Sequence, residues 1–145
     1  MEPFTTRPSP QLVGGPGSLA ELPACVRKSG GEKVLLVTDR GIVEAGHISR
    51  ATALLEGAGI ACSVYDGTSE NPEESDIRAA MEFAREVGPD CVVGLGGGSS
   101  MDTAKGCNFL LTNGGAMSDY KGYGAAKTPL LPFIGVPTTS GTGSE

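Results

Sequence analysis

Short apolar runs alternate with longer segments of mixed polarity along this chain. The run at 33–38 (K-V-L-L-V-T) is continuous and rich in β-branched residues, which is typical of a strand buried on both faces of a sheet. The runs at 60–65 and 90–95 have the same character, and 130–136 is a fourth candidate. Pro132 in the last run favours a sheet edge or a strand start, because proline cannot donate a ladder hydrogen bond. The pattern therefore predicts four strands.

The segments between these runs have helical patterns. The clearest, at 73–87, places four apolar residues at the i, i+3, i+4, i+7 spacing of one helix face. The segment 99–111 opens with Ser99 and Asp102, an S-x-x-D arrangement that resembles a capping box and predicts a helix start. Weaker helical patterns cover 20–28 and about 41–56.

Strands that alternate with helices at this spacing predict βαβ units. The expected fold is α/β, with an open, mostly parallel sheet and helices on both faces, in a Rossmann-like arrangement. The length favours one domain over residues 1–145, in which the glycine-containing stretch 113–129 is irregular. Ligands of such sheets collect outside the carboxyl ends of the strands, so the candidate residues are those that follow the strands.

Charge and composition exclude several classes of partner. The chain has 11 Lys and Arg against 17 Asp and Glu, and no basic run, so neither a nucleic-acid nor an anionic membrane surface is expected. No apolar run is long enough to span a membrane. The cysteines form no C-x-x-C pair and lie in or beside apolar segments, which predicts small buried side chains in a reducing compartment, the cytoplasm by default. These cysteines are Cys25, Cys62, Cys91 and Cys107.

A glycine-rich stretch, 94–100 (G-L-G-G-G-S-S), lies where a predicted strand ends and a helix begins. Backbone amides at such a place, together with the helix dipole, form an anion site, and glycine lets a pyrophosphate approach the backbone closely. The alternative is a tight turn that needs positive φ angles and holds no ligand. One glycine would suffice for the turn, so three in a row favour a ligand.

This stretch matches neither of the two common phosphate-binding fingerprints. A P-loop needs Lys-Ser or Lys-Thr after its glycines, and none follows here. A Rossmann G-x-G-x-x-G would start at Gly94 and Gly96, but its third position is Ser99. If the stretch binds a nucleotide, it does so with a motif that differs from both fingerprints.

Two further features follow predicted strands. Asp39 comes directly after the strand at 33–38 and could accept hydrogen bonds from two ribose hydroxyls while repelling a 2′-phosphate. It could equally cap the helix expected to start near Gly41. The turn 137–143 (P-T-T-S-G-T-G) could hold another part of an extended cofactor, although such clusters are common in loops.

Four motifs together resemble the iron-containing (group III) alcohol dehydrogenase family. They are V-T-D at 37–39, E-N-P at 70–72, G-G-G-S-S-M-D-T-A-K at 96–105 and P-T-T-S-G-T-G-S-E at 137–145. The resemblance implies an N-terminal dinucleotide-binding domain of an NAD(P)-dependent enzyme. Enzymes of this family interconvert alcohols with aldehydes or ketones, so the implied substrate is a small alcohol or aldehyde.

The resemblance also assigns roles to residues. Gly97, Gly98 and Ser99 match the family's pyrophosphate cradle, and Asp39 matches the residue that selects the adenosine ribose. A carboxylate at that position favours NAD over NADP as the cofactor.

The remaining matched positions lie around the same cofactor. Asn71 and Asp102 correspond to the nicotinamide side of the cleft. Thr138, Thr139 and Thr142 match the loop that flanks the adenine and the phosphates. No catalytic residue is assigned.

The family's metal ion is held by a carboxylate and histidines of a second, helical domain. This chain has one histidine, His47, in a predicted surface helix, and one histidine cannot make a multidentate site. We therefore expect the chain to be the cofactor-binding part of a larger two-domain enzyme, to bind no metal itself and to be inactive alone. Whether the complete enzyme uses iron or zinc, and whether it forms a homodimer, is left open.

Two other functions remain as alternatives. Glycerol-dehydrogenase-like and dehydroquinate-synthase-like enzymes share this architecture, but glycerol-type relatives carry lysine at the position of Ser99. The other alternative is a nucleotide-binding module without catalysis.

Overall fold

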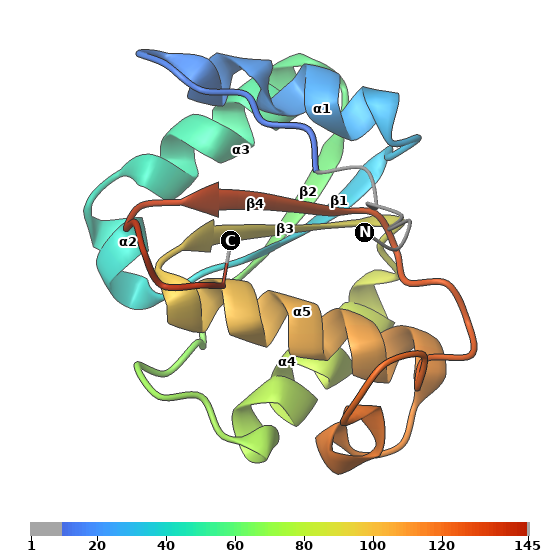
Figure 1. Ribbon diagram of the computed structural model, residues 1–145. Coiled ribbons are helices and arrows are strands. Elements are labelled where there is room, and N and C mark those ends of the chain that lie inside the picture. The colour runs from blue at the N-terminus through green and yellow to red at the C-terminus, as the bar shows by residue number, and fades with distance from the viewer. Residues whose placement is uncertain (1–9, 145) are drawn as a thin grey trace, which may run out of the picture.

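The computed structural model of the protein describes residues 10–144, so the last residue of the motif at 137–145 lies outside the described part. It confirms the α/β fold and all four strands. These are β1 (Lys33–Val37), β2 (Ala61–Tyr65), β3 (Cys91–Gly96) and β4 (Phe133–Pro137). They form one parallel sheet in the order β2-β1-β3-β4, with helices on both faces (Figure 1).

Burial along the strands follows their place in the sheet. The apolar residues of the two central strands, β1 and β3, are buried between two layers of helices, which explains their continuous apolar sequences. β4 lies at the edge of the described sheet, and Pro132 stands immediately before it. The carbonyl of Pro132 accepts a hydrogen bond from the amide of Val92 at 2.9 Å, so proline contributes an acceptor where it has no donor. The predicted edge or start position is confirmed.

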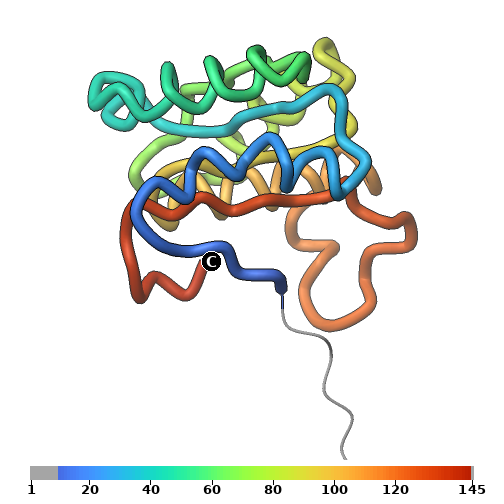
Figure 2. The backbone as a smooth tube through the Cα atoms, turned by 90° about the horizontal axis from the view of Figure 1, so that it is seen from above, coloured from blue at the N-terminus to red at the C-terminus, as the bar shows by residue number. Residues whose placement is uncertain are grey.

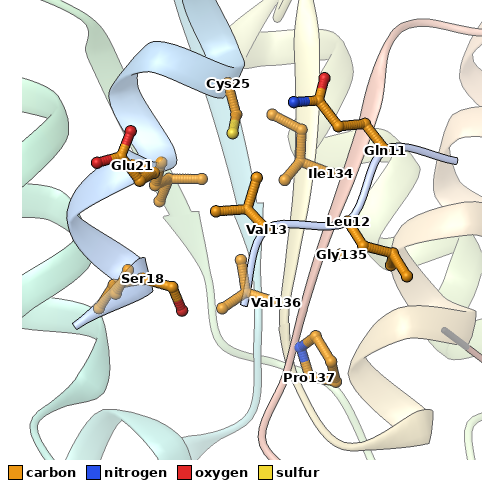
Figure 3. Close-up of a pocket in the computed structure, with 12 residues that line it drawn as sticks. Gln11, Leu12, Val13, Ser18, Glu21, Cys25, Ile134, Gly135, Val136 and Pro137 are labelled. Atoms are coloured by element: carbon orange, nitrogen blue, oxygen red, sulfur yellow. The ribbon is translucent and has the colours of Figure 1, made fainter. Parts of the chain in front are cut away.

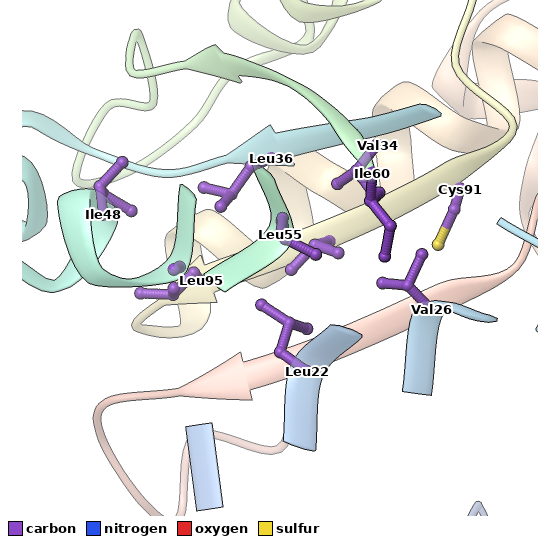
Figure 4. Close-up of a cluster of buried hydrophobic side chains, with 11 residues drawn as sticks. Leu22, Val26, Val34, Leu36, Ile48, Leu55, Ile60, Cys91 and Leu95 are labelled. Atoms are coloured by element: carbon purple, nitrogen blue, oxygen red, sulfur yellow. The ribbon is translucent and has the colours of Figure 1, made fainter. Parts of the chain in front are cut away.

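One face of the sheet is covered by η1 (Ser18–Glu21), α1 (Leu22–Lys28) and α3 (His47–Gly57). Leu22 of α1 and Leu55 of α3 are buried there with Leu36 of β1 and Leu95 of β3 (Figure 4). A fully buried leucine contributes about 1.5–3 kcal/mol relative to an exposed one, so this layer stabilises the sheet strongly.

The opposite face is covered by α4 (Glu74–Val87) and α5 (Gly98–Asn113). The predicted apolar face of α4 is confirmed, with Ala80, Met81 and Ala84 buried and Ile77 packed beside them. A Cβ added at Gly106 of α5 would lie 2.9 Å from the Ile77 side chain, so glycine allows the two helices to approach closely.

The prediction of one continuous helix at about 41–56 is wrong. The segment forms two helices, α2 (Arg40–Glu44) and α3, separated at Gly46, whose φ of 82° no right-handed helix can contain. The segment predicted at 20–28 begins as the 3₁₀ turn η1 before it becomes α1. The irregular stretch after α5 contains one short 3₁₀ turn, η2 (Met117–Tyr120).

Within the described residues, no helix is long and apolar enough to cross a membrane.

Candidate functional site

The candidate residues meet at the edge of the sheet where the parallel strands end. The Thr38 hydroxyl, just after β1, donates a hydrogen bond of 2.8 Å to the carbonyl of Leu95 in β3. The amide of Thr138, just after β4, donates one of 2.8 Å to the carbonyl of Gly96. Three segments that are far apart in the sequence are thus held together at one edge, as the parallel fold predicts.

The turn after β3 presents unpaired backbone amides. Gly97 is the N-cap of α5, and no side chain caps the helix there. The first backbone bond into the helix runs from the amide of Met101 to the carbonyl of Gly97, at 3.1 Å. Within the described residues, the amides of Gly98, Ser99 and Ser100 donate no hydrogen bond. No acidic residue stands in this first helical turn, so the end of α5 is suited to an anion.

The predicted capping box at Ser99 and Asp102 is wrong. α5 begins at Gly98, so Ser99 lies inside the helix instead of at its N-cap. Its hydroxyl donates to the carbonyl of Glu70, in the segment between β2 and α4. Ser99 therefore accepts no backbone amide as a cap, and its own amide in the first turn of α5 is left without a partner among the described residues.

Only one of the three consecutive glycines is required by the turn. Gly96 has a φ of 147°, whereas Gly97 has an ordinary φ of −83° and Gly98 is helical. A Cβ at Gly96 would also lie 2.6 Å from the Ser100 hydroxyl oxygen. The tight-turn explanation therefore accounts for Gly96, and the close loop at Thr142 accounts for Gly98, whereas neither the backbone nor close packing requires Gly97 to be glycine.

Asp39 is half-buried beside this turn, and its two carboxylate oxygens have different partners. Oδ1 accepts the amide of Ile42 at 3.1 Å, so Asp39 caps α2, as one of the two alternatives proposed. Oδ2 accepts the hydroxyl of Ser100 at 3.2 Å. An ionised carboxylate has about four lone-pair sites, so the cap and a ribose contact are compatible. The ribose role stays a prediction.

The hydroxyl-rich loop after β4 lies against the glycine turn. A Cβ at Gly97 would lie 3.5 Å from the Thr139 hydroxyl oxygen, and one at Gly98 would lie 3.2 Å from Cβ of Thr142. Lys105 on α5 donates to the carbonyl of Ser144. The structure thus brings Thr138, Thr139 and Thr142 to the turn, with all three exposed.

Asn71 and Asp102 are both exposed and no hydrogen bond joins their side chains. The bond from Ser99 to the carbonyl of Glu70 brings the segment with Asn71 to the first turn of α5. Asp102 lies three residues after Ser99, hence on the same side of the helix. The structure therefore places this predicted pair along one side of the turn.

Sequence reasoning offered the hydroxyl of Ser99 or Ser100 as a donor to a phosphate, missed the contact of Ser100 with Asp39, and gave Thr38 no role of its own. The side chains of Ser100 and Thr38 are completely buried, and each donates across to another strand end. The only signal was their presence in the motifs at 96–105 and 37–39, where the neighbouring residues attracted the assignments.

Two hollows in the described residues lie beside β4. One of about 300 Å³ runs beside the outer edge of β4, where Val13, Cys25, Ile134 and Val136 surround it (Figure 3). The tube view shows the segment that follows residue 10 running close to β4 (Figure 2). No predicted site residue lines this hollow, whereas another of about 260 Å³ at the ends of β3 and β4 is lined by Thr138 together with Leu95 and Pro137.

The titratable groups of the described residues offer no metal centre. No group of three or more His, Cys, Asp or Glu side chains is placed to hold an ion there, and His47 is exposed at the start of α3. All four cysteines are free. Burial raises the pKa of the Cys107 thiol to about 12 and, together with Glu56, that of Cys62 to about 11, so neither is a ready nucleophile.

Comparison with known proteins bears on the fold and the family of this chain. Alcohol dehydrogenase 4 of Schizosaccharomyces pombe is 40% identical over 131 residues, which cover 90% of this chain and 31% of that protein. A crystal structure of 1,3-propanediol oxidoreductase superposes with a TM-score of 0.85 at 34% identity, over 90% of this chain and 34% of the other. The crystal structure of sulfoacetaldehyde reductase from Bifidobacterium kashiwanohense, solved with NAD⁺, superposes with a TM-score of 0.76 at 33% identity. The match covers 90% of this chain and 35% of that protein.

The chain thus spans about a third of the length of these relatives. The sequence model of the iron-containing alcohol dehydrogenases matches residues 9–145, which is nearly the whole chain. This chain belongs to the iron-containing alcohol dehydrogenase family.

Proposed function

We propose that this chain is the NAD-binding part of a metal-dependent alcohol dehydrogenase that interconverts small alcohols and aldehydes or ketones. One observation carries the proposal: a half-exposed carboxylate after β1 and three unpaired amides after β3 stand at the same edge of the sheet. These are the two kinds of group that a dinucleotide needs, one for its ribose and one for its pyrophosphate.

The pyrophosphate would lie against the first turn of α5. The amides of Gly98, Ser99 and Ser100 supply donors, and the helix dipole adds a favourable potential for an anion. The turn does not need Gly97 for its conformation, so the absence of a side chain there supports close approach by a ligand.

The adenosine ribose would lie against Asp39. The carboxylate has lone pairs left after its bonds to Ile42 and Ser100, and these could accept both ribose hydroxyls. A 2′-phosphate at the same place would meet a like charge, which costs several kcal/mol in a specific interface. Asp39 therefore favours NAD over NADP.

When bound, NAD would supply the hydride acceptor of the reaction. The residues of this chain would hold and orient it, with Asn71 and Asp102 on the nicotinamide side and the loop of Thr138, Thr139 and Thr142 along the phosphates. A solved relative, sulfoacetaldehyde reductase, contains NAD⁺, which supports this cofactor.

The metal would be bound outside the residues described here, since they contain no cluster that could hold it. We propose that this chain alone has negligible turnover and contributes cofactor binding. Its four free thiols support a reducing compartment, the cytoplasm.

Calorimetric titration with NAD and with NADP tests the proposal. We expect NAD to bind more tightly, and Asp39→Asn to reduce the preference by about tenfold or more, since about 1.4 kcal/mol corresponds to tenfold. Asparagine is the appropriate variant because it removes the charge and still caps a helix. No binding of either cofactor to the folded chain, or an unchanged preference in the variant, would contradict the proposal.

A further inference from the structure

Ser100 and Asp39 join the two parts of the proposed cofactor site. Ser100 lies in the first turn of α5, with its side chain completely buried, and Asp39 follows β1. The Ser100 hydroxyl donates to Oδ2 of Asp39 at 3.2 Å, across 61 positions of sequence. Among the described residues this carboxylate oxygen is the only hydrogen-bond partner of that hydroxyl.

We propose that Ser100 is a positioning residue that fixes the Asp39 carboxylate for ribose recognition and so sets the preference between NAD and NADP. The inference rests on the proposed function, because it assigns a purpose to the orientation of Asp39. Ser100 itself touches the ribose-binding carboxylate and not the ribose.

The two carboxylate oxygens are held from different sides. Oδ1 accepts the amide of Ile42 in α2, and Oδ2 accepts the hydroxyl of Ser100 in α5. Two bonds to two different oxygens fix the rotation of the carboxylate about its last torsion, whereas one bond leaves it free to turn. The remaining lone pairs are then presented in one direction before any ligand arrives.

The backbone at Gly96 leaves the space that the contact between Ser100 and Asp39 occupies. A Cβ at Gly96 would lie 2.6 Å from Oγ of Ser100 and 3.4 Å from Oδ2 of Asp39, so a side chain there would occupy the space of the contact. The bond from the Thr38 hydroxyl to the carbonyl of Leu95 holds the adjoining strand ends at a fixed separation. Ser100 therefore reaches Asp39 from a rigid base.

The consequence is a mechanical link between pyrophosphate and ribose recognition. The amide of Ser100 belongs to the proposed pyrophosphate site, and its hydroxyl orients the ribose carboxylate. Without the hydroxyl, the carboxylate must be ordered when the ribose binds. We expect the preference for NAD over NADP to fall by about three- to tenfold, the worth of one ordinary hydrogen bond.

The test compares Ser100→Ala with a matched control on the same helix. Thr103 is also completely buried on α5, and within the described part of the chain its hydroxyl has no hydrogen-bond partner. Thr103→Val removes that hydroxyl at nearly constant volume and leaves the contact with Asp39 intact. A variant that restores a hydroxyl, Ser100→Thr, should recover the preference wherever its circular dichroism and melting curve match those of the unsubstituted protein.

Two measurements are made on each protein. Nuclear magnetic resonance of the cofactor-free protein reports the carboxyl carbon shift of Asp39 and the couplings that define its χ1 angle. Calorimetric titration with NAD and NADP reports the preference. We expect Ser100→Ala to shift the carboxyl resonance, average the couplings and lower the preference, while Thr103→Val changes none of them.

The results separate this inference from the proposed function. If Asp39→Asn lowers the preference and Ser100→Ala does not, the ribose role of Asp39 stands and the positioning role of Ser100 is overturned. If neither cofactor binds, the proposed function fails, and the resonances of the cofactor-free protein still decide the positioning claim. Unchanged Asp39 resonances in Ser100→Ala overturn it in either case.

Discussion

The hydroxyl of Thr38 donates a 2.8 Å hydrogen bond to the carbonyl of Leu95 and so joins the end of β1 to the end of β3. Thr38 is completely buried, so water cannot replace this bond when the hydroxyl is removed. Leaving a buried acceptor with a lost partner costs about 1–3 kcal/mol. The two strand ends carry the carboxylate and the glycine turn of the proposed site, which makes this bond a structural support for both.

Thr38→Val is therefore expected to lower the free energy of unfolding by about 1–2 kcal/mol, measured by urea denaturation. Thr103→Val serves as the control, because it removes a buried hydroxyl that has no partner among the described residues. The free energy of unfolding of that control should lie within about 0.5 kcal/mol of the value for the unsubstituted protein, or slightly above it. Equal losses in both variants would show that the bond to Leu95 contributes nothing specific.

Gly96 is required by the backbone itself. Its φ of 147° is strained for any other residue, and a Cβ there would overlap the Ser100 hydroxyl. Gly96→Ala should lower the free energy of unfolding by at least about 1–3 kcal/mol. Gly57→Ala, at a helical position with open space around it, should be neutral or stabilising by up to about 1 kcal/mol. A stable Gly96→Ala protein would contradict the account of the turn.

Gly97 distinguishes a ligand site from a simple turn. Its φ of −83° suits any residue, and an added Cβ would meet Thr139 at an ordinary contact distance of 3.5 Å. Gly97→Ala should thus keep its thermal stability while NAD affinity falls by about tenfold, because the methyl group obstructs approach of the pyrophosphate to the backbone. Parallel melting curves and calorimetric titrations check this. Unchanged affinity would remove Gly97 from the proposed cradle.

The buried thiol of Cys107 predicts a loss of stability at alkaline pH. Burial raises its pKa from 9.0 to about 12 in the folded chain. As pH rises above about 9, the unfolded chain releases this proton while the folded chain retains it, so unfolding is favoured increasingly until about pH 12. Denaturation measured across this range should give a falling free energy of unfolding. The slope should be smaller in Cys107→Ala, and an identical slope would exclude this origin.

The strands could be predicted because burial on both faces imposes an unbroken apolar sequence, as in β1 and β3. The break between α2 and α3 could not, because it depends on the positive φ of Gly46, one glycine among 23 in the chain. The ends of helices were harder to predict than the strands, because they too depend on the backbone angles of single residues. Whether Gly97 or Ser99 caps α5 is decided by backbone angles that the local pattern does not determine.

The positions of the candidate site residues in the fold could be predicted from the sequence, whereas their contacts could not. The motifs placed Asp39 and the glycine turn at strand ends, and the structure confirms both placements. The bonds from Ser99 to Glu70 and from Ser100 to Asp39 join residues 29 and 61 positions apart, so no local spacing could reveal them. Such contacts depend on how the strands are ordered in the sheet, which periodicity alone leaves open.

The most direct test of the central claim is a map of where NAD binds. A titration of the ¹⁵N-labelled protein with NAD, followed by amide resonances, should produce its largest shifts at Gly98, Ser99 and Ser100 and at Asp39. Those four residues unite the unpaired amides of α5 with the carboxylate after β1. Shifts concentrated beside the outer edge of β4, or no saturable shifts at all, would contradict the claim that this edge of the sheet holds the cofactor.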